Sequence, residues 1–135
     1  MSVFHGTTYT SLVNLLSGQS RQFSRLSVTD TAERAQLYAD AQATREVATE
    51  IRRATGSAVV QMTTTEDLNW IRRDEGHNSL DKCEATIKTW NIVKVIAFTT
   101  EYNFKNSVIK VNGSYVNTFE YLTQELGDKL EIVIK

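Results

Sequence analysis

The sequence contains no proline and only one cysteine, Cys83, among its 135 residues. About seven prolines would be typical of this length. Turns must therefore be formed by glycine, asparagine, aspartate, serine or threonine, and a proline-rich ligand segment is excluded. One cysteine excludes an internal disulfide, and the two histidines and the cysteine show no zinc-binding spacing. We therefore predict no metal site.

Long hydrophobic runs and an excess of one charge sign are missing as well. No run approaches the roughly 18 apolar residues of a membrane span, and the N-terminus, MSVFHGTT, lacks the basic start and apolar stretch of a secretory signal. Fifteen basic and 16 acidic residues give a net charge of -1, which argues against a broad basic surface for duplex nucleic acid. We expect a cytoplasmic monomer with no membrane partner.

The residues that are present suit one folded domain spanning 1–135. Hydrophobic residues make up 41% and charged residues 23% of the chain, a balance typical of globular proteins. Apolar periodicity and capping residues predict helices at 11–18, 32–55 and 118–126. Runs of β-forming residues predict strands at 2–5, 26–28, 57–63, 68–71, 83–87, 92–98, 108–111, 114–116 and 130–134. This layout indicates an α+β fold.

Three chemically competent side chains stand near the ends of predicted elements. His5 closes the first strand beside Gly6, which lets a ligand approach the backbone. Tyr38 lies in the second turn of the long helix, and Glu84 begins a strand after a polar loop. Taken singly, each has a structural alternative: a satisfied surface histidine, a core tyrosine and a solvated glutamate.

The order of the surrounding segments is more informative than any one residue. An aromatic-His-Gly-Thr segment, Phe4 to Thr7, precedes a helix with a closing glycine. A strand with a hydroxyl residue, Ser27, is followed by an Ala-x-x-Tyr-Ala helix, and Glu84 opens a later strand. In this order the segments resemble the ADP-ribosyltransferase fold family, in its His-Tyr-Glu branch. The resemblance covers residues 3–98, and residues 101–135 are predicted to add a hairpin with its turn at Asn112-Gly113, a helix and a strand of unknown role.

This resemblance implies a split β-sandwich with helices flanking a central NAD cleft. His5 would hold the adenosine ribose, the Gly6 backbone would bond the nicotinamide carboxamide, and Tyr38 would stack on the nicotinamide ring. Glu84 would be the catalytic residue, because its carboxylate stabilises the positive charge that grows on the ribose as nicotinamide leaves. The remaining predicted NAD-binding residues are Thr7, Ser27 and, for the diphosphate, Arg21 and Arg25.

The implied activity is mono-ADP-ribosyl transfer: cleavage of NAD at the nicotinamide–ribose bond and transfer of ADP-ribose to a protein or nucleic acid. Such a domain suits a toxin, an effector or a phage-encoded modifier of host molecules. The predicted acceptor contacts lie in and beside the loop 72–81, at Trp70, Arg72, Arg73, His77 and Lys82. Lys82 stands where arginine-modifying members carry glutamate or glutamine, which argues against an arginine acceptor.

Two alternatives remain open at this stage. One is an NAD-dependent enzyme similar to RNA 2′-phosphotransferases, which share the His-Gly-Thr segment and the fold but usually carry an additional basic N-terminal module. The other is a non-catalytic module on the same fold that binds a nucleotide or inhibits a partner by contact.

Overall fold

The computed structural model describes residues 2–16, 25–50, 56–73 and 82–135. Helices and strands are mixed along the chain, which confirms the predicted α+β class. The N-terminal part forms β1 (Ser2–Thr8), α1 (Tyr9–Leu16), β2 (Leu26–Val28), α2 (Ala32–Glu50), β3 (Ser57–Thr63), β4 (Ile71–Arg73), β5 (Lys82–Ile87) and β6 (Asn91–Thr99). The C-terminal part forms α3 (Glu101–Asn106), β7 (Val108–Val111), β8 (Ser114–Asn117), α4 (Thr118–Leu126), a 3-10 turn (Gly127–Lys129) and β9 (Leu130–Ile134).

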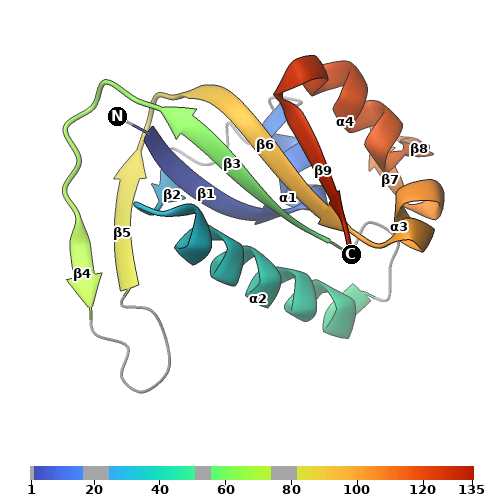
Figure 1. The fold of residues 1–135 in the computed structure, drawn as a ribbon, viewed down its shortest axis with the longest axis horizontal. Coiled ribbons are helices and arrows are strands. Elements are labelled where there is room, and N and C mark those ends of the chain that lie inside the picture. The colour runs from blue at the N-terminus through green and yellow to red at the C-terminus, as the bar shows by residue number, and fades with distance from the viewer. Residues whose placement is uncertain (1, 17–24, 51–55, 74–81) are drawn as a thin grey trace.

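Three sheets are present in the described part of the chain. The largest has the strand order β1-β3-β6-β9, in which β9 runs parallel to β6 and the other pairs are antiparallel. A second sheet has the antiparallel order β2-β5-β4, and β7 and β8 form a hairpin. The hairpin turn is Asn112-Gly113, as predicted, and both residues have positive φ angles. Figure 1 shows β4 and β5 at one end of the molecule and α3, α4 and the hairpin at the other.

In the described part of the chain, one backbone bridge joins the two larger sheets, between Phe4 of β1 and Thr29 just after β2. The Phe4 N–H donates to the Thr29 carbonyl at 3.0 Å, and the Thr29 N–H donates to the Phe4 carbonyl at 2.8 Å. In the described residues this bridge is isolated, and the strand partners of β1 and β2 are otherwise β3 and β5. The edge of β1 therefore separates from β2 next to the bridge.

Helix α2 covers one face of the large sheet through very small residues. Its Ala35 and Ala39 are fully buried, and it packs against β1 at Gly6. A Cβ atom added to Gly6 would lie 1.8 Å from the Ala35 carbonyl oxygen. The predicted end of the first strand at His5 is therefore wrong: β1 continues to Thr8, and Gly6 is required because the α2 backbone occupies the space of a side chain.

The opposite face of the sheet carries the main hydrophobic core. Side chains alternate along a strand, so Val3, Val60 and Met62 lie on the face away from α2. They belong to one buried cluster with residues of the second sheet, of α1 and of the C-terminal part: Val28, Ala85 and Ile87, then Tyr9, Leu12 and Val13, then Ile109, Phe119, Leu122 and Leu126. Both larger sheets thus contribute to the same core.

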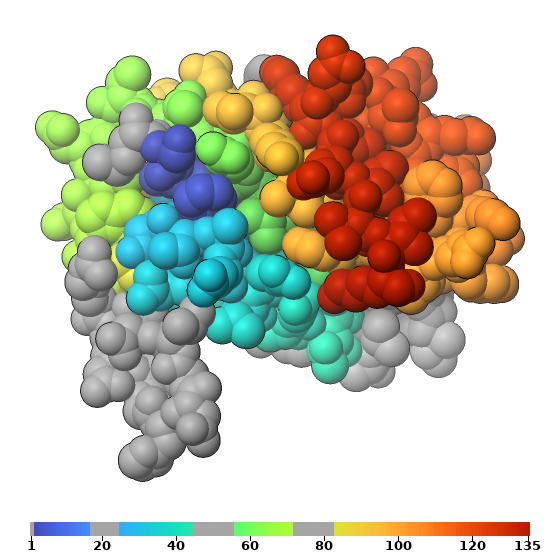
Figure 2. Space-filling view, viewed as in Figure 1, coloured from blue at the N-terminus to red at the C-terminus, as the bar shows by residue number. Residues whose placement is uncertain are grey.

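Residues 101–135 are an integral part of this fold, whereas the sequence predicted an extension of unknown role. Strand β9 extends the large sheet beside β6, and Phe119 of α4 packs edge-on against the Tyr9 ring at 5.4 Å between centroids. In the space-filling view the orange and red C-terminal segment forms one end of the molecule (Figure 2). Helix α3 was not predicted. None of the helices in the described ranges is long and apolar enough to cross a membrane.

Candidate functional site

A cavity of about 250 Å³ opens where the two sheets separate beside the Phe4–Thr29 bridge. We call it the Glu84 cavity. Four elements that are distant in sequence line it: β1, β2, α2 and β5. Their lining residues include five of the predicted site residues, His5, Gly6, Ser27, Tyr38 and Glu84. The fold therefore brings together the three residues that sequence analysis singled out.

A second cavity of about 310 Å³, the Arg25 cavity, adjoins the first. Arg25 and Thr7, both predicted site residues, line it together with Ser11 and Asn14 of α1. The two cavities share His5, Ser27 and Gln42 as lining residues. They therefore form one cleft with two compartments, divided at these three residues.

His5 is held in one orientation and one tautomer. Its Nδ1 lies 2.7 Å from the carbonyl oxygen of Ser27, which can only accept, so Nδ1 carries the proton that is donated. In the neutral ring Nε2 is then a hydrogen-bond acceptor. Burial lowers the pKa of His5 below its usual 6.5, and the hydrogen bond to Ser27 opposes this effect only in part. The neutral imidazole is therefore favoured near neutral pH, with Nε2 able to accept from a ligand hydroxyl.

The backbone N–H and C=O groups of Gly6 point to the same edge of β1 as those of Phe4. Phe4 uses this edge to bond Thr29, and the edge to which backbone groups point alternates between neighbouring residues of an antiparallel strand. The N–H and C=O of Gly6, two residues on, therefore lie toward the cleft and away from β3. One donor and one acceptor on a single residue match a carboxamide, whose NH2 group donates and whose oxygen accepts.

Helix α2 fixes the position of Tyr38. The hydroxyl of Thr31 accepts from the Arg34 N–H at 3.2 Å and caps the first turn. Arg34 also bonds Asp30 at 2.6 Å, so that Asp30 has a lowered pKa although its burial acts in the opposite direction. Ala35 and Ala39 press the same helix onto β1. Tyr38 is thus carried into the Glu84 cavity by a helix anchored at its start and along its buried face.

Glu84 is half-buried on β5, the middle strand of the second sheet, which has β2 on one side and β4 on the other. Ile71 of β4 stands opposite it, and the next residue, Ala85, pairs with Val28 of β2. The hydroxyl of Thr29 donates to the carbonyl of neighbouring Cys83 at 2.6 Å and ties β5 to the bridge between the sheets. Among the described residues, Glu84 provides the one carboxylate that lines its cavity, and no carboxylate lines the Arg25 cavity.

Of the predicted acceptor-binding residues, one lies apart from the cleft, three lie on strands β4 and β5, and one is outside the described residues. Trp70 is partly buried and packs against the hydrophobic core, and it lines neither cavity. Arg72 and Arg73 belong to strand β4, so the loop begins later than the predicted residue 72. Lys82 is the first residue of β5. His77 and Arg21 are outside the described residues.

Sequence reasoning missed Gln42, which lines both cavities. The available signal was its position: Gln42 follows Tyr38 by one helical turn and so lies on the same side of α2. Within the described ranges, no group of three His, Cys, Asp or Glu residues is arranged to hold a metal ion. Comparisons of the chain with protein-family models, with curated proteins and with solved structures find no match.

Proposed function

We propose that the protein is a mono-ADP-ribosyltransferase that binds NAD in this two-compartment cleft. The observation that carries the proposal is the convergence of His5, Gly6, Tyr38 and Glu84 on one cavity from three separate elements. These residues come from positions as far apart as 5 and 84, so their proximity is not a consequence of sequence spacing. The resemblance of the sequence segments to the ADP-ribosyltransferase family and this geometry support the same ligand.

The charges of the two compartments complement two oppositely charged groups of NAD. The nicotinamide ring of NAD is cationic, and the Glu84 cavity offers a carboxylate and the flat ring of Tyr38. The diphosphate is anionic, and the Arg25 cavity offers a guanidinium without any carboxylate among its described lining residues. Their volumes, about 250 and 310 Å³, together fall within the range of about 300–1,000 Å³ that is common for small-molecule sites.

The proposed reaction breaks the bond between the ribose C1′ and the nicotinamide nitrogen. The bonding electron pair leaves with nicotinamide, so that positive charge grows on the ribose ring. The Glu84 carboxylate, bonded to a ribose hydroxyl, stabilises that charge more in the transition state than in the bound substrate. A nucleophile of a protein or nucleic-acid acceptor then bonds to C1′ and loses its proton.

The contacts of the neutral residues position NAD for this step. Gly6 would bond the carboxamide through its backbone N–H and C=O, which holds the nicotinamide ring against Tyr38. The Nε2 atom of His5 would accept from a hydroxyl of the adenosine ribose. The β1 ladder and the His5–Ser27 hydrogen bond already fix both groups. These groups therefore lose little conformational entropy when NAD binds.

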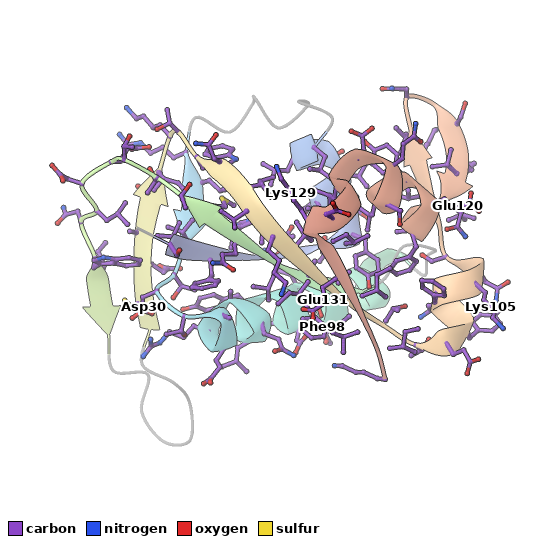
Figure 3. The ribbon with its side chains drawn as sticks, turned by 45° about the horizontal axis from the view of Figure 1, so that its top comes forward. Asp30, Phe98, Lys105, Glu120, Lys129 and Glu131 are labelled. Carbon is purple, nitrogen blue, oxygen red and sulfur yellow. The ribbon has the colours of Figure 1, made fainter. Side chains whose placement is uncertain are left out.

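Incubation with labelled NAD and a cell lysate tests the proposal. The wild type should release nicotinamide and label a macromolecule, whereas Glu84→Gln should abolish both and leave the free energy of NAD binding within about 1 kcal/mol. Glu120→Gln is the matched control, because Glu120 is an exposed glutamate on α4, far from Asp30 and the start of α2 (Figure 3). NAD binding without any nicotinamide release by the wild type would contradict a transferase and favour a binding module.

A further inference from the structure

Gln42 is the one described residue of α2 that lines both compartments of the cleft. It lies four residues after Tyr38 on α2 and lines both compartments, and the other two residues that do so are His5 and Ser27. His5 and Ser27 come from β1 and β2, whereas Gln42 comes from the helix. Among the described lining residues of the Arg25 cavity, Gln42 is the sole contribution from α2. A ligand that fills both compartments must pass between Gln42 and the His5–Ser27 pair.

The side chains at this junction indicate which part of a ligand lies there. In NAD the group that joins the two nucleosides is the diphosphate. A glutamine side chain is neutral and carries two N–H donors, which suit phosphate oxygens. The nearby Arg25 adds positive charge, and no carboxylate lines that compartment in the described part of the chain. Donors of this kind at the junction favour an anionic linker.

We infer that Gln42 is a positioning residue that binds the diphosphate linker and thereby sets how far each nucleoside reaches into its compartment. The inference rests on the proposed function, since it takes NAD as the ligand, and it deepens that function by naming the class: dinucleotides joined through a diphosphate. Gln42 is exposed and is therefore not required by the hydrophobic core. Its role is to orient the substrate, while Glu84 acts on the reacting atoms.

Charge substitutions at position 42 test the inference through NAD affinity, measured calorimetrically with the full chain. Gln42→Glu should weaken binding about tenfold or more, because a carboxylate repels the diphosphate and donates no hydrogen bond. Gln42→Lys should retain the wild-type affinity or exceed it, because an ammonium group attracts the same linker. Loss of affinity in the acidic variant but not in the basic one separates a contact with an anion from a simple loss of packing.

The same helix supplies a matched control. Gln36 is also a glutamine of α2 and lines neither compartment, so Gln36→Glu and Gln36→Lys should leave NAD affinity within about twofold. Thermal unfolding of each variant checks that it is folded. Equal weakening by both Gln42 substitutions, or an unchanged affinity in Gln42→Glu, would overturn the inference while leaving NAD binding by the wild type intact. A wild type that does not bind NAD would overturn the proposed function, and this inference with it.

Discussion

Two helices pack on the large sheet by opposite means. Helix α2 lies on β1 through Gly6, Ala35 and Ala39, so that the Ala35 carbonyl fills the space of the missing glycine side chain. Helix α4 packs through large side chains, above all Phe119 and Leu122, which are buried against α1 and the sheet. The cleft lies beside the first helix and away from the second.

This difference shows where the fold is sensitive to added atoms and where it is sensitive to lost ones. Close contact between α2 and β1 depends on the absence of side-chain atoms, and it places Tyr38 near His5. The α4 end depends on filled volume. Substitutions at the two ends should therefore both reduce stability, but only those under α2 should also move the cleft.

Loss of volume at the α4 end should have the largest effect on stability. Phe119 is 3% exposed and contacts the rings of Tyr9 and Phe104. Phe119→Ala should lower the free energy of unfolding by about 3–5 kcal/mol, because it removes a buried aromatic ring and leaves a cavity. Urea unfolding measures the change, and Phe119→Leu should cost less. Loss of NAD affinity in the still-folded Phe119→Ala protein would contradict the separation of the two ends.

An added methyl group under α2 should have a smaller effect on stability and a larger one on the cleft. Gly6→Ala should destabilise the protein by about 1–3 kcal/mol, because the helix backbone must move away from the new Cβ atom. Binding of NAD should be largely lost as Tyr38 moves with the helix, and titration of the folded variant measures this.

Gly113→Ala is the matched control for that substitution. Gly113 has a φ of 86° and no atom within 4 Å of its missing Cβ, so its cost is backbone strain of about 1–2 kcal/mol without any collision. NAD affinity should be unchanged. Equal loss of affinity in Gly113→Ala and Gly6→Ala would show that overall destabilisation, and not a shift of α2, weakens binding.

The smallest expected effect is that of acidic pH, which should act on the cleft end of the molecule through His5. Above pH 6.5 His5 is neutral in both the folded and the unfolded chain. Below it the unfolded chain gains a proton that buried His5 resists, so the unfolding free energy falls until the pH passes the lowered pKa of the folded state. NAD affinity should fall at that lower pH, because protonation turns Nε2 from an acceptor into a donor.

His5→Asn is the control for the acid effect. The Asn side chain can still donate to the Ser27 carbonyl but does not titrate. The difference in pH dependence between the wild type and this variant isolates His5 from all other groups. Identical pH profiles for NAD binding by the two proteins would contradict the assignment of Nε2 as an acceptor.

The fold could be predicted where local pattern and tertiary pairing agree. Strands 57–63 and 130–134, helix 118–126 and the Asn112-Gly113 turn were predicted with the correct bounds. Helix α3 was missed because none of its six residues is buried, which leaves no apolar period. The Thr100 side chain that accepts from the Asn103 N–H was the signal available. The strand predicted at 68–71 was displaced because β4 is defined by its pairing with β5.

The candidate site could be predicted in its residues but not in its shape. Motif order singled out His5, Tyr38 and Glu84, and the structure brings them to one cavity. Two features depend on tertiary packing and could not be read from one sequence: the collision that makes Gly6 necessary, and the division of the cleft at Gln42. Both arise where α2 meets β1, which no local pattern describes.

The parallel pairing of β9 with β6 bears on how the chain is made. Every described residue that lines the cleft precedes residue 85, but β6 acquires its second neighbour only from residues 130–134. During synthesis from the N-terminus, the cleft elements emerge while the edge of β6 is still unpaired and able to join a strand of another molecule. A nascent chain therefore carries every described residue that lines its cleft before it carries the last strand of its sheet, and translation through β9 ends the exposure of the β6 edge.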